Sequence, residues 1–326
     1  MRYLKNNSTD PYFNMAFDEF CLEQLTIENP VFYLWQNQPS VIMGANQEVN
    51  TEVNLDFLKE HSIKLVRRVS GGGTVYHDLG NLNYTIVGRS KDLETDYPEY
   101  TQYMLQALQS LGIPATLSGR NDIMVEGRKV SGFAKRVCHD RLMVHGTLMF
   151  DVDMDILSQV LCPTSSKLQS KGVSSVRSRV TNLSHYLPQM SDICTFKQEL
   201  EKILSNNYED KEYLLSTEDI QSIQQLANEK FASKEWIYGH SPRATMKHSA
   251  RFACGTIEIN LTLNGNCIEF CTFGGDFLGN LPVSTIEDAL KGIPYDYTCI
   301  QNKLLEFSID NYFDGLSTED LLKLIL

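Results

Sequence analysis

The chain has 326 residues, of which 42% are hydrophobic, 29 are Lys or Arg and 41 are Asp or Glu. This length suggests two domains, and the hydrophobic content is enough for a sizeable core. A formal net charge of −12 argues against general affinity for nucleic acid, whose phosphates attract basic proteins. No apolar run is long enough to span a membrane, and the N-terminus lacks the apolar segment of a signal peptide. We therefore expect a cytoplasmic protein that binds neither nucleic acid nor membrane.

Eight cysteines are scattered along the chain without a CxxC pair. Structural zinc sites usually contain such pairs, so the cysteines do not predict one. In a chain of this size they indicate reduced thiols of a cytosolic protein rather than a disulfide framework.

The first third of the chain predicts alternating helices and strands. Apolar residues recur at helical spacing between residues 12 and 25, and Asp10 and Pro11 are suited to begin that helix. Gly112 and Pro114 are suited to end another. Strands are predicted at residues 31–35, 41–43, 63–67 and 82–87, and further helices at 51–61 and 100–111.

The middle of the chain predicts a largely antiparallel sheet. Residues 126–128 make a connection short enough for a hairpin. Residues 167–183 are polar, basic and weakly periodic, which indicates a long loop, and such loops are usually functional or disordered. The strands are expected at residues 115–117, 123–125, 129–135 and 142–150, and helices at 154–161, 196–204 and 217–231.

A cluster of breaker residues at 238–242 indicates a domain boundary. Beyond it, residues 255–263 alternate apolar and polar as a half-buried strand, Asn264-Gly265 makes a hairpin turn, and 267–273 is the return strand. Three helices are expected to follow. We therefore expect one domain at residues 1–243 and a second at 244–326.

The most informative stretch, residues 67–81, reads RRVSGGGTVYHDLGN. Three glycines let a ligand approach the backbone, and Arg67 and Arg68 offer forked donors for phosphate or carboxylate. The stretch is not a Walker P-loop, because no Gly-Lys-Ser/Thr follows, and it is not a Rossmann fingerprint, because a strand follows. It predicts a cradle for an anion, although the three glycines alone suit a tight hairpin with surface arginines at least as well.

Two further positions carry side chains that could do chemistry. Lys129 opens a strand beside a glycine turn, so its ammonium could reach into a cleft, although a single lysine is usually solvated. His145 lies inside an apolar strand, where a histidine is more often a hydrogen-bonded core residue than a catalyst. Neither position indicates a function alone.

Taken together, these motifs closely resemble the lipoate–protein ligase family. The resemblance rests on residues 67–78, 119–122, 129–132 and 145–148, and on 174–183, which resemble the adenylate-binding loop of that family. It extends to a C-terminal accessory domain, marked by residues 255–259 and 275–277. It implies an α+β fold, with a biotin/lipoate-ligase-like large domain of mixed, largely antiparallel sheets and a small α+β C-terminal domain.

The resemblance also implies a two-step reaction. ATP activates lipoate to lipoyl-AMP with release of pyrophosphate, and the lipoyl group then passes to a lysine of an acceptor. The implied acceptors are apo lipoyl domains of 2-oxoacid dehydrogenase complexes or the glycine cleavage H protein, and octanoate is an alternative acid.

The resemblance assigns a role to each motif residue. Lys129 is implied as the catalytic residue, in contact with lipoate and the α-phosphate. The residues implied in binding ATP or lipoyl-AMP are Arg68, Gly73, Thr74, Val75, Tyr76, His77, Asn81, Asp122 and Lys129. Those implied in binding lipoate are Arg68, Ser70, His77 and Lys129.

ATP implies Mg²⁺, which prefers carboxylate and phosphate oxygens, and Asp122 is the residue expected near it. Trp35 and Val69 are expected to contribute to an apolar slot for the lipoate chain, although Trp35 suits an ordinary core equally well. Ala45 stands where many relatives carry a basic residue, so one charge contact near the pocket is expected to be absent.

Other functions stay open at this point. An ATP-independent octanoyl- or lipoyltransferase of the same superfamily would use a cysteine, and Cys162 lies in the right region but has no basic neighbour to activate it. An amidotransferase that moves lipoyl groups between proteins is a second alternative. A biotin ligase is a third, but its arginine- and glycine-rich signature is missing. A catalytically silent lipoate or nucleotide sensor would be expected to lose Lys129 or the glycines, and both are present.

Overall fold

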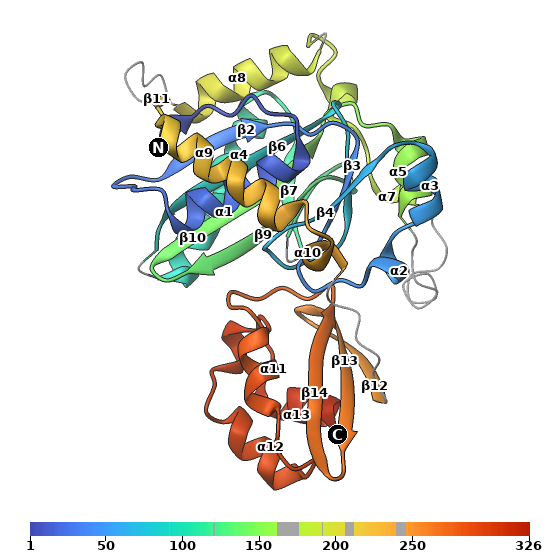
Figure 1. The fold of residues 1–326 in the computed structure, drawn as a ribbon. Coiled ribbons are helices and arrows are strands. Elements are labelled where there is room, and N and C mark those ends of the chain that lie inside the picture. The colour runs from blue at the N-terminus through green and yellow to red at the C-terminus, as the bar shows by residue number, and fades with distance from the viewer. Residues whose placement is uncertain (91, 120, 162–175, 191, 206–211, 239–245) are drawn as a thin grey trace.

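The structure, a computed structural model, describes residues 1–90, 92–119, 121–161, 176–190, 192–205, 212–238 and 246–326. Figure 1 shows a large part, with helices packed around a sheet, and a smaller C-terminal part of strands and helices below it. The breakers at 239–242, predicted to mark the boundary, lie outside the described residues.

Eight strands of the described chain form one sheet, in the order β11-β1-β2-β6-β10-β9-β8-β7. β1 pairs in parallel with β2 and β11, and the other pairs are antiparallel. The antiparallel arrangement predicted for the middle of the chain is thus confirmed. The strands are β1 (Arg2–Leu4), β2 (Val31–Trp35), β6 (Asn81–Arg89), β7 (Ala115–Ser118), β8 (Asp122–Val125), β9 (Arg128–Cys138), β10 (Arg141–Met149) and β11 (Glu212–Tyr213).

A second sheet presents the glycine-rich segment. β3 (Ser40–Met43) lies between β4 (Lys64–Arg67), to which it is parallel, and β5 (Val75–His77), to which it is antiparallel. The glycines connect β4 to β5, as predicted. β2 and β3 follow each other in sequence but belong to different sheets, because β1 and β6 occupy both edges of β2.

Helices cover both faces of the large sheet (Figure 1). α1 (Pro11–Glu23) begins at Asp10, whose carboxylate accepts a hydrogen bond from Tyr12 N, as predicted. It packs on one face with α9 (Thr217–Leu226) and the π-helical turn that follows, Ala227–Phe231. On the other face, α4 (Leu93–Ser110) and α8 (Ile193–Ser205) share a core. Alternate residues of β2 point to the two cores, which identifies it as a strand buried on both sides.

The single helix predicted at residues 51–61 is wrong. The chain forms two short helices there, α2 (Val49–Glu52) and α3 (Leu55–Glu60). Between them Val53 is extended and forms a β-bridge with Leu161, and the Asn54 side chain accepts a hydrogen bond from Phe57 N to cap α3. Long-range pairing therefore overrides the local helical pattern. The other helices here are α5 (Met154–Val160), α7 (Val176–Arg179), the 3₁₀ turn Leu183–Tyr186 and α10 (Lys234–Tyr238).

The C-terminal unit, residues 246–326, has its own apolar core. β13 (Gly255–Asn264) and β14 (Cys267–Gly275) form the predicted hairpin, and β12 (Met246–Phe252), which was not predicted, adds a third strand. The three predicted helices are confirmed as α11 (Ser284–Leu290), α12 (Tyr297–Leu304) and α13 (Thr318–Ile325), with a 3₁₀ turn at Ile309–Asn311. Their apolar faces pack on the sheet in a cluster separate from those of the large part.

The C-terminal unit touches the glycine-rich segment directly. Gly72 N donates to Phe277 O at 3.1 Å, and Lys135 Nζ lies 3.3 Å from Asp314 Oδ2. The two parts therefore share backbone and ionic contacts next to the predicted site. In the part of the chain that the structure describes, no helix is both long and apolar enough to cross a bilayer.

Candidate active site

A cavity of about 130 Å³ lies where the glycine-rich segment faces β9 and β10. Apolar and polar side chains both line it, so it can hold an amphipathic ligand. The polar lining residues are Arg68, Thr74, His77, Asn83, Asn121, Lys129, His145 and Thr147. The apolar ones are Met15, Trp35, Ile42, Val75, Phe133 and Ala134, and glycines 72, 73, 132 and 146 complete the lining.

Two glycines leave the cavity open on the loop side. Gly72 has a φ of +90°, a conformation that residues with a Cβ rarely adopt. A Cβ on Gly73 would meet no atom within 4 Å, so the space beside its backbone is free. The loop can therefore receive a ligand against its main chain.

The adjacent arginines do different things, because they point to opposite sides of the chain. Arg67 is 1% exposed, away from the cavity, and donates to backbone carbonyls of residues 44, 45, 47, 236 and 237. Arg68 lines the cavity and donates from Nε to Ser70 Oγ at 3.0 Å and from Nη2 to Gly71 O at 2.6 Å and Gly73 O at 2.9 Å. Burial and the neighbouring Arg67 charge lower the pKa of Arg68 to about 10, so it is a cation at pH 7. No carboxylate of the described chain pairs with it.

A bulge in β9 directs Lys129 to the cavity. The pairing of β8 with β9 shifts by one residue, which leaves Val130 as the extra residue. Lys129 consequently shares a face with Gly132, although strict alternation would place the two on opposite faces. A Cβ on Gly132 would lie 2.8 Å from Lys129 Nζ, so the glycine makes room for the ammonium. Lys129 Nζ lies 2.7 Å from Asp122 Oδ1, and both side chains are about one-third exposed.

The described end of the predicted adenylate-binding loop lies beside Lys129. Thr181 N donates to Lys129 O at 3.0 Å, and Val180 forms a parallel β-bridge with Lys129. The loop therefore returns to the cavity at its C-terminal end. Arg120 and residues 162–175, which include Cys162, lie outside the described residues.

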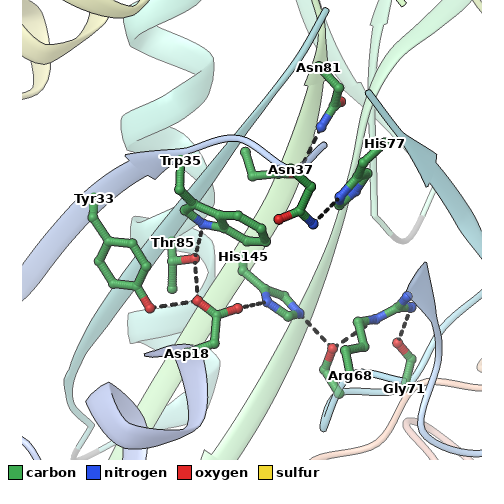
Figure 2. Close-up of polar contacts among 12 residues, drawn as sticks. Asp18, Tyr33, Trp35, Asn37, Arg68, Gly71, His77, Asn81, Thr85 and His145 are labelled. Atoms are coloured by element: carbon green, nitrogen blue, oxygen red, sulfur yellow. Dashed lines mark hydrogen bonds and ion pairs between the residues drawn. The ribbon is translucent and has the colours of Figure 1, made fainter. Parts of the chain in front are cut away.

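A buried hydrogen-bonded chain runs behind the cavity (Figure 2). Arg68 Nε contacts Ser70 Oγ, which lies 2.6 Å from His145 Nε2, and His145 Nδ1 lies 2.7 Å from Asp18 Oδ2. Asp18 Oδ1 accepts hydrogen bonds from Tyr33 and Thr85. Five segments of the chain therefore meet in one network: α1, β2, the glycine-rich segment, β6 and β10.

His77 lines the cavity with a neutral ring. Its Nδ1 accepts a hydrogen bond from Asn37 Nδ2 at 3.1 Å, so its proton is on Nε2, and no described atom pairs with Nε2. Burial, together with proximity to Arg68 and His145, lowers the pKa of His77 to about 3, so the ring is neutral at pH 7. Asn83 also lines the cavity, and its Nδ2 is likewise buried without a partner among the described residues.

Comparisons with known proteins agree with this geometry. Residues 10–205 match the profile of the lipoyl protein ligase A/B catalytic domain, and residues 241–325 match the bacterial lipoate protein ligase C-terminus. A curated relative, lipoate-protein ligase LplJ of Bacillus subtilis, is 38% identical over 100% of both chains. The chain belongs to the lipoate–protein ligase family.

Solved structures of similar proteins show the same fold. The P. falciparum protein LipL1, crystallised with lipoate, superimposes with a TM-score of 0.79 at 24% identity, over 99% of this chain and 97% of that chain. A lipoate-protein ligase A bound with ATP has a TM-score of 0.64 at 26% identity, over 74% of this chain and 99% of that one. The predicted α+β fold, with a mostly antiparallel large sheet and a small C-terminal unit, is confirmed.

Most of the residues that the resemblance to lipoate–protein ligases implies lie together. Arg68, Gly73, Thr74, Val75, His77 and Lys129 line the cavity. Asp122 does not line the cavity but forms an ion pair with Lys129, which does. Ser70 accepts a hydrogen bond from Arg68. Tyr76 points away into an apolar cluster, so only its backbone could face a nucleotide. Asn81 is buried and donates to Asn83 Oδ1 at 2.9 Å, one residue removed from the cavity.

Sequence reasoning missed Asp18 and Asn83, and it gave no role to Asn121 or Thr147. Asp18 could have been found, because it interrupts the apolar face of a helix at a position that helical periodicity buries. Asn121 and Thr147 lie within motifs that carry the family resemblance, whereas Asn83 is an ordinary polar residue of a strand and gives no such signal. The stretch at 44–47, which was not predicted as a site, supports the loop: Gln47 Oε1 accepts a hydrogen bond from Thr74 Oγ1 at 2.6 Å.

Proposed function

We propose that this protein is an ATP-dependent lipoate–protein ligase, which converts lipoate to lipoyl-AMP and transfers the lipoyl group to a lysine of an acceptor protein. The observation that carries the proposal is one cavity lined by two cations, Lys129 and the buried Arg68, which has no carboxylate partner in the described chain. A buried cation is stabilised when an anion occupies the site beside it.

In the first step a lipoate carboxylate oxygen attacks the α-phosphorus of ATP, and pyrophosphate leaves. The attacking carboxylate oxygen loses negative charge, while negative charge develops on the α-phosphoryl oxygens and on the oxygen that leaves with pyrophosphate. Lys129 exchanges its ion pair with Asp122 for these oxygens, and Arg68 faces them from the loop. Fixed charges aimed at a developing anion typically lower the barrier by several kcal/mol. In the second step the neutral amine of the acceptor lysine attacks the carbonyl carbon, and AMP leaves.

The apolar part of the lining suits the lipoate chain. Met15, Trp35 and Phe133 contribute to it, so Trp35 combines a core position with a cavity surface. Burial of roughly six methylene-sized groups at about 0.8 kcal/mol each would contribute about 5 kcal/mol to binding. Val69 packs in the core behind the loop instead of lining the cavity.

ATP brings Mg²⁺, and Asp122 is the residue that we propose near it. Among the described residues there is no group of three or more His, Cys, Asp or Glu that could hold a metal. Mg²⁺ is often held by one or two carboxylates and by substrate phosphates, so a single carboxylate beside the cavity fits that mode. The ion would neutralise phosphate charge there.

We further propose that residues 1–243 form the catalytic domain and 244–326 an accessory domain, a division supported by the separate apolar core of the C-terminal unit. The proposed acceptors are apo lipoyl domains of 2-oxoacid dehydrogenase complexes or the glycine cleavage H protein. Because the reaction consumes ATP and the described cysteines are free thiols, we place it in the cytoplasm.

The test is ATP–pyrophosphate exchange measured with lipoate and with octanoate. The expected result is exchange that depends on the acid, and lipoylation of an apo lipoyl domain detected by mass spectrometry only when ATP is present. The same assay is applied to Lys129→Ala, for which Lys202→Ala, the removal of an exposed lysine paired with Glu199, is the matched control. Absence of exchange with both acids, or acyl transfer without ATP, would overturn the proposal.

A further inference from the structure

The function proposed above uses Arg68 but gives no role to Asp18, a carboxylate that is 1% exposed within α1. Its Oδ1 accepts hydrogen bonds from Tyr33 at 2.6 Å and Thr85 at 3.0 Å, and its Oδ2 lies 2.7 Å from His145 Nδ1. A buried ionised group contributes less to stability than a well-packed apolar residue of similar volume. Packing alone therefore gives no reason for a carboxylate at this position.

The hydrogen bonds run in one direction from Arg68 to Asp18. A guanidinium only donates, so Ser70 Oγ accepts from Arg68 Nε. The single proton of Ser70 is then free to go to His145 Nε2, 2.6 Å away. A neutral His145 must carry its proton on Nδ1, where it donates to Asp18 Oδ2. Each proton of the chain is used once, and Asp18 is the acceptor at its end (Figure 2).

This series of hydrogen bonds fixes the plane of the Arg68 guanidinium. Ser70 holds Nε, Ile42 O holds Nη1 at 3.2 Å, and Gly71 O and Gly73 O hold Nη2, so the group cannot rotate about its long axis without breaking several hydrogen bonds. Ser70 in turn depends on His145 for the direction of its hydroxyl proton. The carboxylate of Asp18 selects the His145 tautomer, as a buried carboxylate does for a histidine in hydrolase triads.

We propose that Asp18 is a positioning residue, which acts through His145 and Ser70 to hold the Arg68 guanidinium toward the carboxylate of lipoate. The proposal rests on the ligase function stated above. It assigns to Asp18 no contact with substrate and no proton transfer in the reaction. Its effect is on the recognition of the acid group of the substrate.

Asp18→Asn tests the donor-to-acceptor order of these hydrogen bonds, because Asn has nearly the same shape as Asp but carries an NH₂ group in place of one oxygen. Tyr33 and Thr85 both donate to Oδ1, so the amide oxygen of Asn must occupy that place and its NH₂ group must face His145 Nδ1. His145 then has to accept at Nδ1 and carry its proton on Nε2. Ser70 Oγ would receive protons from both His145 and Arg68, and the order of the chain would be lost.

The readout is the affinity for lipoate compared with that for lipoamide, its neutral amide, both measured by calorimetry. Asp18→Asn is expected to weaken lipoate binding about 10- to 100-fold, the range found for residues that orient metal ligands, which act on a binding group in the same indirect way. Lipoamide binding is expected to stay near the wild-type value, because the amide does not need the guanidinium charge. An equal loss for both compounds would make Asp18 a merely structural residue and overturn the proposal.

Ser70→Ala provides a second test that leaves the buried carboxylate intact. It cuts the chain between His145 and Arg68, so it should also reduce the lipoate-to-lipoamide preference, and the double variant should be no worse than either single one. Additive losses would contradict action through Ser70. Tyr33→Phe is the matched control, since it removes one donor to Asp18 but leaves the chain to Arg68 in place.

The two proposals can fail separately. Wild-type protein without lipoate-dependent ATP–pyrophosphate exchange would contradict the ligase function. Wild-type exchange combined with an unchanged lipoate-to-lipoamide preference in both Asp18→Asn and Ser70→Ala would contradict only the positioning role.

Discussion

The cavity region and the C-terminal unit bury polar groups in opposite ways. Among the described residues, the buried polar and charged side chains lie before residue 190, except for Asn280 and Glu287. The C-terminal unit is instead organised around a continuous apolar cluster, with Phe313 fully buried at its centre. Buried polar groups lower stability unless they are satisfied. Four of those in the large part, Arg68, His77, Asn83 and His145, line the cavity, which suits this region to bind a ligand. The C-terminal unit is built for packing.

The largest effect on stability is expected from Phe313→Ala in the C-terminal unit. The Phe313 ring centroid lies 5.1 Å from that of Phe273 and 4.9 Å from that of Phe277. Removal of a fully buried ring typically costs about 3–5 kcal/mol, which urea unfolding would measure. Exchange activity of the folded protein should change only a few-fold. A large loss of activity without loss of stability would show that the C-terminal unit takes part in adenylation directly.

Lys129→Ala should have the opposite effects: a large loss of activity and little change in stability. Loss of a charge aimed at the developing anion is expected to lower the rate of ATP–pyrophosphate exchange by about 10²–10³-fold. Stability should hardly change, because the ion pair with Asp122 is partly exposed and such pairs contribute little. Exchange kinetics and thermal unfolding of the same preparation measure both. Activity retained in this variant would mean that the role of Lys129 is misassigned.

Glu287→Gln is expected to change how stability depends on pH. Burial raises the pKa of Glu287 to about 7, above its ordinary value of 4.5. The folded state therefore holds a proton that the unfolded state releases, and the stabilisation is complete below pH 4.5 and is lost as the pH rises through about 7. The loss amounts to roughly 3 kcal/mol, since each pKa unit corresponds to about 1.4 kcal/mol.

Gln keeps the acceptor for Phe273 N and cannot ionise, so the variant should show a flatter pH profile between 4.5 and 7 and exceed the wild type in stability at pH 8. Denaturant unfolding at several pH values measures this. An identical slope in both proteins would place the titrating group elsewhere.

The smallest effect is expected from Asp314→Asn, which weakens the ion pair between the two regions. Lys135 is nearly buried and also lies over the Tyr97 ring, at 4.5 Å from its centroid, so it keeps a partner when Asp314 loses its charge. Because Asp314 is 40% exposed, the expected loss is about 1 kcal/mol or less. A change in exchange rate larger than the change in stability would show that this contact couples the C-terminal unit to the cavity.

Local pattern predicted most elements, because helix and strand periodicities are written in neighbouring residues. It identified the helix that begins at Asp10, the β13–β14 hairpin and the loop between β4 and β5. It failed at residues 51–61, where Val53 pairs with a residue more than a hundred positions away. It also could not assign β2 and β3 to different sheets, since that choice depends on which edges are already occupied.

The sequence by itself nominated Arg68, Lys129 and the glycines only jointly, because their motifs together resemble one family, whereas each of them alone suits an ordinary turn or a solvated surface. Only the tertiary structure distinguished the roles of the two arginines: Arg67 donates hydrogen bonds to backbone carbonyls, and Arg68 lines the cavity. Only it showed that Asp18 and His145, 127 residues apart in sequence, share a hydrogen bond. The physical reason is that contacts across a sheet are set by register and bulges, and a one-residue shift in β9 decides on which face Lys129 lies.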